Sequence, residues 1–330
     1  MKYYKESSSD KLVCLLCSHY CKLKNGQTGI CGVNKNTGEK IENLVYGYPA
    51  ATNIDPIEKK PLYHFLPESK SFSIGTVGCN FHCSFCQNWG ISQEKHINKS
   101  NYYSPTDLAR YGYENRCRSM AYTYNEPTIF YPYAKDIAIE AKKLGLKNIY
   151  VTNGFESSEV IDDMKGIIDA ANVDLKSFDA KYYKKNLGGN LDKILENLKH
   201  FKQNGIWIEV TTLIVPTQND SDEELEKIAT FISGQLGAET PWHISAFHPD
   251  YKELKLPRTS IHTLKRAYDI GKKAGLHHIY IGNVGYENQT KCSQCGEILI
   301  DREYFNVIEN NLINGCCPKC EKKLEGIFDE

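Results

Sequence analysis

Short apolar segments alternate with amphipathic ones between residues 70 and 285, and this alternation constrains the fold more than any other feature. Segments rich in β-branched and aromatic residues predict strands at 72–77, 120–124, 148–152, 172–175, 206–215 and 242–247, with a possible seventh at 278–282. Parallel strands need crossover connections, which the intervening helices supply. We therefore expect an α/β fold whose strand and helix units form a right-handed array, a partial (β/α)6 barrel of the TIM type.

The predicted helices carry signals at both ends. Ser104 precedes Pro105 and Asp107, which is typical of an N-cap and its first turn. Ser221 precedes an acidic first turn in the same way. Glycines that suit a left-handed residue after a helix follow three predicted helices, at Gly145, Gly205 and Gly275.

The 13 cysteines fall into three groups, and only Cys117 stands alone. An odd number of cysteines in a chain without an apparent export signal points to metal thiolates in a reducing compartment rather than to disulfides. We expect a cytoplasmic protein with an N-terminal Cys-rich segment at 1–60, the partial barrel at 61–285 and a zinc-ribbon-like module at 286–330.

The middle cysteine group has the spacing C-x3-C-x2-C, so Cys79, Cys83 and Cys86 offer three thiolates on one tight loop. A [4Fe-4S] cluster normally has four thiolate ligands, and three would leave one iron open. An open iron can chelate the amino and carboxylate groups of S-adenosylmethionine (SAM). An electron from the cluster can then cleave SAM to methionine and a 5′-deoxyadenosyl radical, chemistry that side chains alone cannot perform.

A zinc knuckle, or three unrelated cysteines, is the alternative interpretation of this loop. Aromatic residues alternate with the cysteines, at Phe81, Phe85 and Trp89. Because a cluster needs apolar surroundings that limit the access of solvent and oxygen, these residues favour the cluster.

The C-terminal cysteines form two knuckles, Cys292-x2-Cys295 and Cys317-x2-Cys320, of the kind that closes a tetrahedral zinc site. We expect a structural zinc ion there, with Cys316 as the spare cysteine. The alternative is a catalytic or second redox centre.

The N-terminal cysteines have the spacing C-x2-C-x3-C-x9-C, and they are Cys14, Cys17, Cys21 and Cys31. Four thiolates suit a metal, but the spacing is less like that of a zinc ribbon. Zinc and an auxiliary iron-sulfur cluster both remain open for this site.

Functional residues of TIM-type barrels lie at the carboxyl ends of the strands. Polar residues follow or end each predicted strand in turn: the cysteine loop, Asn125 and Glu126, Thr152 and Asn153, Asp174 and Lys176, Thr211 and Thr212, and His248. Any one of these is more often a cap, a turn or a buried polar group. Six consecutive strands that each bring a polar group to one rim together predict an active site.

Several of these segments resemble the radical SAM superfamily, specifically its pyruvate formate-lyase activating enzyme-like branch. They are segments 78–87, 124–127, 151–155, 173–176 and 214–216. Segments 14–17, 60–65 and 246–250 and the terminal cysteines are similar to the radical SAM enzymes of the AmmeMemoRadiSam system. This similarity extends from about residue 12 to 328.

The resemblance implies that Cys79, Cys83 and Cys86 ligate the cluster and that Phe85 shields it near the adenine of SAM. It implies an oxidoreductase or activase that receives electrons from a donor such as a flavodoxin or ferredoxin. The substrate, either a small molecule or a partner protein, is not implied.

The resemblance also implies the residues that contact SAM. Glu126 holds the methionine ammonium, an assignment that the charges also favour. Asn153, Asp174 and Lys176 contact the ribose and the methionine carboxylate, and His248 approaches the adenosyl group.

Two positions differ from the family pattern. Tyr124-Asn125 replaces paired glycines, so the backbone path to the ammonium differs. Val151 stands where glycyl-radical activators carry an acid associated with a monovalent cation.

Three functions remain as hypotheses, led by an enzyme that cleaves SAM and abstracts hydrogen from a substrate. The second is activation of a glycyl-radical enzyme, against which stands the expectation that the two end modules cover the mouth of the barrel. The third is a non-catalytic, zinc-bearing module that binds RNA or protein. The net charge of −1 and the lack of a basic aromatic stripe argue against nucleic acid as a partner. No apolar run approaches the length of a membrane span.

Overall fold

The computed structural model describes residues 2–8, 10–286 and 288–328. Residues 1, 9, 287, 329 and 330, which belong to the predicted end segments, lie outside these ranges. None of the helices in the described ranges is long and apolar enough to cross a membrane.

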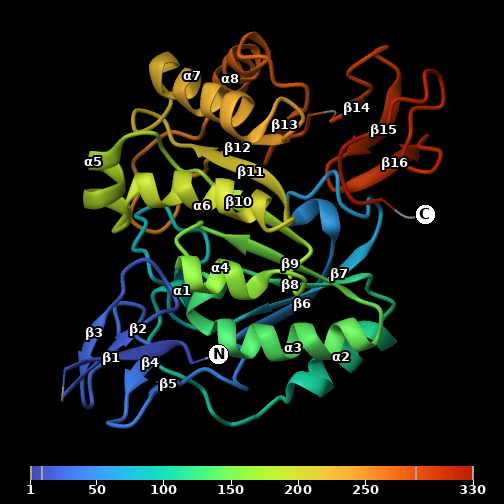
Figure 1. Ribbon diagram of the computed structural model, residues 1–330. Coiled ribbons are helices and arrows are strands. Elements are labelled where there is room, and N and C mark those ends of the chain that lie inside the picture. The colour runs from blue at the N-terminus through green and yellow to red at the C-terminus, as the bar shows by residue number, and fades with distance from the viewer. Residues whose placement is uncertain (1, 9, 287, 329–330) are drawn as a thin grey trace.

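An eight-stranded sheet forms the centre of the molecule, in the order β13-β12-β11-β10-β9-β8-β7-β6 (Figure 1). Its strands are β6 (Ala51–Pro56), β7 (Lys70–Gly75), β8 (Ser119–Tyr122), β9 (Lys147–Thr152), β10 (Ala170–Asp174), β11 (Trp207–Ile214), β12 (Trp242–Ala246) and β13 (Ile279–Gly282). Strands β7 to β13 pair in parallel, each with the next in sequence. The sheet does not close, since β6 and β13 form its two edges. The predicted partial barrel is confirmed.

Strand β6 is the part of the sheet that the sequence pattern does not predict. It pairs antiparallel with β7, from Ala51 opposite Gly75 to Pro56 opposite Lys70. It falls in the range predicted for the N-terminal segment, and yet it belongs to the main sheet. Its sequence, ATNIDP, has too few apolar residues to show the alternation typical of a strand.

Helices cover the outer face of the sheet (Figure 1). The longer ones are α2 (Pro105–Glu114), α3 (Tyr131–Lys143), α4 (Ser158–Met164), α6 (Leu191–Gln203), α7 (Asp222–Phe231) and α8 (Ile261–Lys273). Short helical segments are α1 (Trp89–Ser92), η1 (Ile57–Lys59), η2 (Pro127–Phe130), α5 (Ala180–Tyr182), η3 (Tyr183–Leu187) and η4 (Ile232–Leu236).

The predicted helix boundaries are confirmed. The hydroxyls of Ser104 and Ser221 accept hydrogen bonds from the backbone N–H groups of Asp107 and Glu224, respectively. The three glycines after the helices have left-handed φ angles of +78°, +76° and +91°, for Gly145, Gly205 and Gly275.

The N-terminal residues form a small module beside the carboxyl ends of the parallel strands. It comprises the sheet of β1 (Tyr4–Ser8), β2 (Lys11–Cys14) and β3 (Lys22–Lys24) and the hairpin of β4 (Asn34–Asn36) and β5 (Ile41–Asn43). Ser18 N–H donates to the carbonyl of Phe155, and Ser157 Oγ donates to the carbonyl of Leu15. Both partners come from the loop after β9, so this module lies next to the rim.

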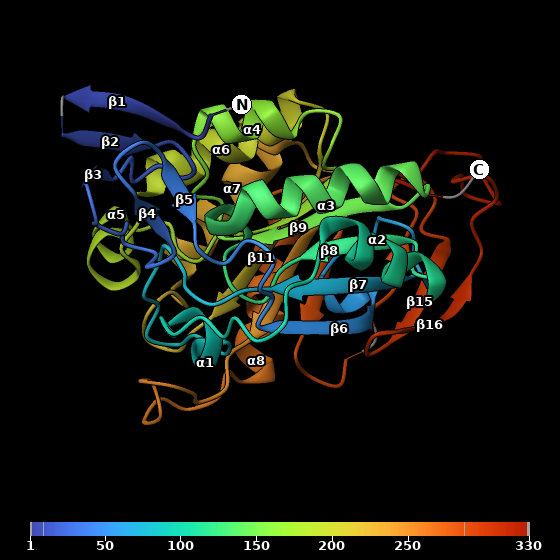
Figure 2. The ribbon, with the colours of Figure 1, turned by 90° about the horizontal axis from the view of Figure 1, so that it is seen from below.

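The C-terminal module lies at the opposite end of the molecule, as both ribbon views show (Figure 1 and Figure 2). It contains β14 (Thr290–Lys291), β15 (Ile298–Glu303) and β16 (Asn306–Asn310). Its tail bonds to residues 64–66 through Ile327, whose backbone N–H donates to His64 and whose carbonyl accepts from Leu66. The expectation that both end modules cover the mouth of the barrel is therefore wrong for this module.

A buried network beneath the sheet fixes this docking. The carboxylate of Glu209, near the start of β11, accepts from the backbone N–H groups of Tyr63 (2.9 Å) and His64 (2.8 Å). His243 Nε2, near the start of β12, lies 2.6 Å from the same carboxylate. These contacts hold residues 61–66 at the amino ends of the strands, and the C-terminal module packs against this segment.

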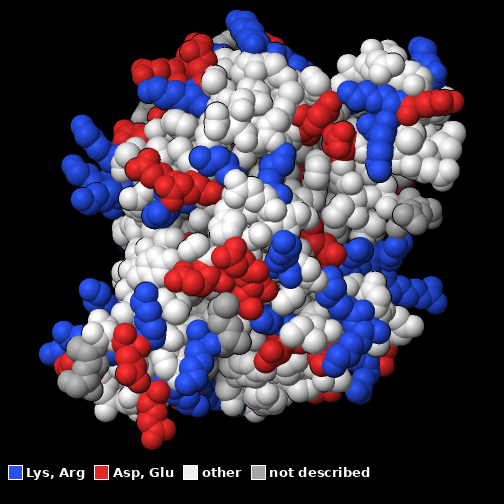
Figure 3. All heavy atoms as spheres, viewed as in Figure 1, with Lys and Arg blue, Asp and Glu red and all other residues white. Residues whose placement is uncertain are grey.

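On the surface, acidic and basic residues are mixed over the face that Figure 3 draws.

Candidate active site

The loop after β7 brings the central cysteines to one cavity. The cavity has a volume of about 290 Å³ and is lined by all three side chains, Cys79, Cys83 and Cys86. Most of its other walls come from the carboxyl ends of β8 to β12 and the residues that follow them, and Lys59, Pro61 and Asn283 complete the lining. The three thiols thus face a common space at the predicted rim.

Side chains from the neighbouring loops hold the cysteine loop in place. Asn125 Nδ2 donates to Gly78 O (2.8 Å) and to Thr76 Oγ1 (3.1 Å), and its Oδ1 accepts from Thr76 N–H (3.2 Å). Asn153 Nδ2 donates to Asn80 Oδ1 at 2.8 Å. Asn125 therefore supports the loop, a role that the sequence pattern does not reveal. Tyr124 adopts a φ of +71°, the left-handed conformation that a glycine in its place would favour.

Glu126 lines the cavity and is 2% exposed. Its Oε1 accepts from the Thr128 N–H, the Thr128 hydroxyl and the Thr152 hydroxyl, at 3.0, 2.6 and 2.9 Å. Its Oε2 accepts one bond, from the Asn153 N–H at 2.7 Å. A carboxylate oxygen can accept more than one hydrogen bond, so Oε2 retains capacity for a further donor.

A second carboxyl group, which the sequence pattern does not single out, lies behind Glu126. Glu156 Oε1 is 2.5 Å from the Thr152 hydroxyl and 3.0 Å from the Thr128 hydroxyl, so the same two hydroxyls contact both acids. Burial, and then the charge of Glu126, raises the pKa of Glu156. Glu156 does not line the cavity, and no local sequence signal marks its pairing with Glu126.

Asp174 and Lys176 lie on the adjacent wall, after β10. Lys176 Nζ and Asp174 Oδ2 form an ion pair of 2.6 Å. Burial alone lowers the pKa of Lys176, but Asp174 and then Cys83 raise it, and the net direction is upward. The cavity thus carries the carboxyl group of Glu126, whose pKa burial raises, on the wall next to an ion pair that contains a cation.

Of the remaining predicted site residues, Phe85 and Asn153 line the cavity, and His248 lies just outside it. His248 Nδ1 is 3.1 Å from Gln87 Nε2, so it contacts the cysteine loop. Thr211 also lines the cavity. Thr212 does not, because its hydroxyl accepts from Trp242 Nε1 and donates to Leu175 O on the far side of β11.

The predicted apolar surroundings of the cysteine loop are correct for two of three aromatic residues. Phe81 and Phe85 are each 3% exposed. The prediction is wrong for Trp89, which is 46% exposed and stacks on Tyr251 with ring centroids 5.4 Å apart. Its exposure follows from its place at the start of α1, after the last cysteine.

The terminal cysteine groups differ in geometry. The sulfurs of Cys292, Cys295, Cys317 and Cys320 all lie within 4.8 Å of one another, and Cys316 is outside this group. The N-terminal thiols are neighbours too, since burial and then the charges of Cys31, Cys14 and Cys21 raise the pKa of Cys17.

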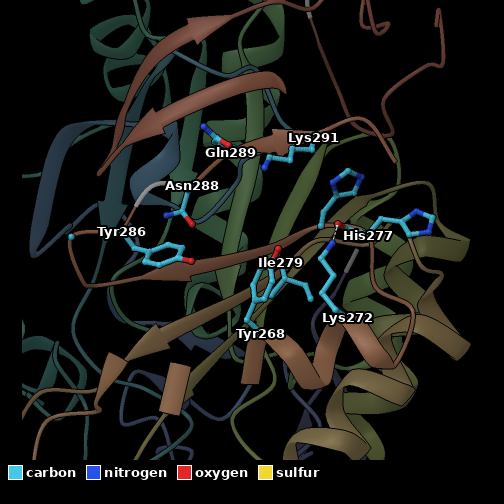
Figure 4. A pocket seen from close by; sticks show the side chains of 10 residues that line it. Tyr268, Lys272, His277, Ile279, Tyr286, Asn288, Gln289 and Lys291 are labelled. Carbon is cyan, nitrogen blue, oxygen red and sulfur yellow. Dashed lines mark hydrogen bonds between the residues drawn. The ribbon is translucent and has the colours of Figure 1, made fainter. Parts of the chain in front are cut away.

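A larger cavity, of about 460 Å³, lies at the β13 edge of the sheet, between α8, β13 and residues 285, 286, 288, 289 and 291 (Figure 4). Lys272 and Lys291 point into it, and Tyr268 and Tyr286 form part of its wall. It contains no cysteine, so it is not the site that the cysteine loop builds.

Comparison with known proteins places the fold and the cysteine loop in a family. Residues 73–232 match the model of the radical SAM superfamily. An uncharacterized protein of Methanocaldococcus jannaschii is 38% identical over 98% of both chains. The chain belongs to the radical SAM superfamily. It is an enzyme of that superfamily, whose members use a [4Fe-4S] cluster and SAM.

Activating enzymes are among the relatives of this radical SAM chain. The benzylsuccinate synthase activating enzyme of Thauera aromatica is 26% identical over 41% of each chain. In fold, the chain is similar to a radical SAM methyltransferase from Sphaerobacter thermophilus, with a TM-score of 0.53 and 14% identity over 67% of this chain and 68% of that one. SuiB of Streptococcus suis bound to SAM gives a TM-score of 0.51 and 15% identity, over 68% of this chain and 52% of that one.

Proposed function

We propose that Cys79, Cys83 and Cys86 hold the [4Fe-4S] cluster and that the cavity beside them binds SAM. The single observation that carries this proposal is that the three thiols line one cavity whose other walls carry Glu126 and Lys176. When bound, the cluster and SAM supply a 5′-deoxyadenosyl radical that abstracts hydrogen from the substrate.

Opposite charges in the cavity match the charged ends of an amino acid. Glu126 has an acceptor position left on Oε2 for the methionine ammonium, and a charge-assisted hydrogen bond of this kind is strong. Lys176, with Asp174 beside it, would bind the carboxylate or the ribose. Asn153, Phe85 and His248 would complete the site, at the ribose, the adenine and the adenosyl group.

We also propose a structural zinc ion at the four C-terminal cysteines. Sulfurs about 2.3 Å from a zinc ion form a tetrahedron with edges of about 3.8 Å. The Cys292–Cys320 and Cys295–Cys317 sulfur distances of 3.5 and 3.6 Å agree with that size. This site lies far from the rim, so its role would be to hold the module rather than to react.

The substrate class has two candidates, a small molecule and a partner protein. The position of the C-terminal module favours a partner protein, because that module leaves the mouth of the barrel clear. The sequence pattern alone predicts that it covers the mouth. Activation of a glycyl-radical partner is therefore the second candidate function. In either case a one-electron donor protein would be the redox partner.

Anaerobic reconstitution with iron and sulfide, followed by an assay for 5′-deoxyadenosine, tests the function. The wild-type chain should form 5′-deoxyadenosine from SAM under a strong reductant, and the Cys79→Ala, Cys83→Ala, Cys86→Ala triple variant should form none. Undiminished product from the triple variant would refute the proposal. Cys117→Ala, which removes a buried cysteine outside the three groups, is the matched control.

A further inference from the structure

We infer that Cys14, Cys17, Cys21 and Cys31 bind a second iron-sulfur cluster, which passes electrons to the cluster on the central loop. The inference builds on the proposed function of that loop. It rests on three features of the N-terminal module: the spacing of its thiols, the groups that surround them, and direct contact with the central loop.

Thiol spacing separates the N-terminal group from the zinc-like group. Among the residues that the structure describes, the C-terminal four are the only set of three or more potential ligands that lie within 4.8 Å of one another. Neither the N-terminal cysteines nor Cys79, Cys83 and Cys86 are so close together. A single zinc ion holds its thiolate sulfurs about 3.8 Å from one another, whereas the thiolates of a cubane cluster bind different irons and lie farther apart. The N-terminal group therefore resembles the cluster loop, not the zinc ribbon.

The surroundings of the N-terminal thiols suit an iron-sulfur cluster. A methyl group at Gly29 would lie 3.6 Å from Cys21 Sγ and 3.7 Å from Cys31 Sγ, so one backbone position is next to both sulfurs. Leu16 and Val33, at 3% and 0% exposure, provide an apolar surrounding. Asn34 Nδ2 donates to Cys31 Sγ at 3.5 Å, and hydrogen bonds to sulfur tune cluster potentials.

The N-terminal module touches the central cysteine loop directly. Gly78, which precedes Cys79, has no side chain because a methyl group there would lie 2.5 Å from the carbonyl oxygen of Cys31. His19 Nε2 is 3.0 Å from the carbonyl of Asn80. Since electron tunnelling weakens steeply with distance, two clusters held on contacting segments are suited to electron transfer.

Aromatic rings add a packed path between the same segments. The ring centroids of His19 and Phe155 are 4.9 Å apart, and those of Phe155 and Phe81 are 5.4 Å apart. Phe81 stands between Cys79 and Cys83. The C-terminal cysteines, at the other end of the sheet, have no such contact with the loop in the described part of the chain.

The electron balance of the transfer is simple. A low-potential one-electron reductant reduces the second cluster by one electron, and that electron then reduces the cluster on the central loop. From there it breaks one carbon–sulfur bond of SAM and yields methionine and the radical. The second cluster returns to its oxidised state and forms no bond to substrate.

Metal and sulfide analysis of full-length variants tests the site. The triple variant of Cys79, Cys83 and Cys86 should retain about half of the wild-type iron and sulfide, together with one zinc ion per chain. Cys17→Ser and Cys31→Ser should lose the other half, while Cys117→Ala loses none. If the N-terminal variants keep all iron but lose one zinc ion, the inference is overturned. If the triple variant keeps all iron, the proposed function fails instead.

Electron paramagnetic resonance tests the transfer. The dithionite-reduced wild type should show the broadened or split signal of two neighbouring spins. The triple variant and Cys31→Ser should each show the signal of one isolated cluster. A wild-type spectrum equal to the sum of these two would mean that the clusters are too far apart to interact, which would refute the transfer. Far-ultraviolet circular dichroism of each variant checks that it is folded.

Discussion

At the scale of single residues, Glu126 and Glu156 decide the charge of the candidate SAM cavity. Four short oxygen contacts join these acids to the hydroxyls of Thr128 and Thr152. Two hydroxyls carry only two protons, so they cannot donate in all four contacts, and a proton on one of the acids supplies a third donor. Burial raises the pKa of both acids, and the charge of Glu126 raises the pKa of Glu156 further, which assigns that proton to Glu156. The pair then carries one negative charge, on the residue that faces the cavity.

The pair allows a matched test of SAM binding. Glu126→Gln removes the charge and should weaken SAM binding by about 1.5 to 3 kcal/mol, the usual strength of a hydrogen bond to a charged group. Glu156→Gln resembles the protonated acid and should change the affinity by less than about 0.5 kcal/mol. Equilibrium binding of SAM to reconstituted protein measures both. Equal losses in the two variants would contradict the assignment, and iron content should be unchanged in either.

Asn125 acts on the cysteine loop rather than on SAM. Asn125→Ala would leave the buried Gly78 carbonyl and Thr76 N–H without these partners, at a cost of about 1 to 3 kcal/mol. We expect faster loss of the loop cluster to a chelator, followed by its absorbance, with SAM affinity of the intact fraction unchanged. Asn115→Ala, at an exposed asparagine at the end of α2, is the control. A rate of cluster loss equal to that of the wild type would show that the loop keeps its conformation without Asn125.

At the scale of elements, a chain of hydrogen bonds joins β13 to the C-terminal module. Arg302 donates to Thr290 Oγ1 (2.8 Å), and Thr290 and Tyr280 oxygens are 2.8 Å apart. Tyr280 Oη is 2.7 Å from His64 Nε2, and His64 Nδ1 is 2.8 Å from the carbonyl of Glu325. A carbonyl only accepts, so Nδ1 carries a proton; burial lowers the pKa of the ring, and the neutral ring then accepts from Tyr280 at Nε2. This direction requires a neutral His64.

The neutral state of His64 makes stability depend on pH. Burial, and then the neighbouring His278, lowers its pKa to about 3, against about 6.5 in an unfolded chain. Between these values the unfolded chain binds a proton that the folded chain does not. The free energy of unfolding should therefore fall as pH decreases through this window, by up to about 1.4 kcal/mol per pH unit from this residue. Urea unfolding at pH 7 and at pH 5.5 measures this change in the free energy of unfolding.

The His64→Gln variant provides the comparison for this pH dependence. Gln keeps a donor and an acceptor in the side chain but cannot titrate, so the pH slope should decrease by about one proton. The same slope in both proteins would show that His64 is not the group responsible. The variant should be less stable than wild type at pH 7, since the amide cannot reproduce both ring contacts.

At the scale of the whole molecule, the two end modules serve opposite ends of one sheet. The N-terminal module touches the cysteine loop, whereas the C-terminal module packs against residues 61–66 beneath the sheet. The C-terminal core is small, with Leu299, Ile300 and Leu324 as its buried aliphatic side chains. A module of this size depends on its metal for folding.

Removing the C-terminal metal should therefore loosen this module alone. Cys292→Ser should release one zinc ion per chain and expose residues 288–328 to proteolysis, while the barrel keeps its loop cluster and its cleavage of SAM. Cys316→Ser, next to the group but outside it, should do neither. Limited proteolysis with mass spectrometry and metal analysis measures both effects. Iron with sulfide in place of zinc would make the site a redox centre and contradict the structural role.

The sequence alone determined the features that depend on neighbours along the chain. Strand and helix periodicity predicted the parallel strands of the partial barrel, serines and glycines marked the helix ends, and C-x3-C-x2-C identified the cysteine loop. Each is local, because spacing within a loop or a helical turn sets the geometry directly. The rim residues Glu126, Asn153, Asp174 and Lys176 followed from the rule that parallel strands end at one edge.

Only the tertiary structure decided contacts between distant segments. The pairing of Glu126 with Glu156, the support of Gly78 by Asn125, and the docking of residues 61–66 beneath the sheet depend on packing that no local pattern encodes. The sequence of β6 lacks the alternation typical of a strand. The strand forms because β7 provides an edge whose backbone groups can pair with it. The end modules are alike in their cysteine content, and it is the packing of each against the sheet that places one beside the reactive loop and the other at the far end.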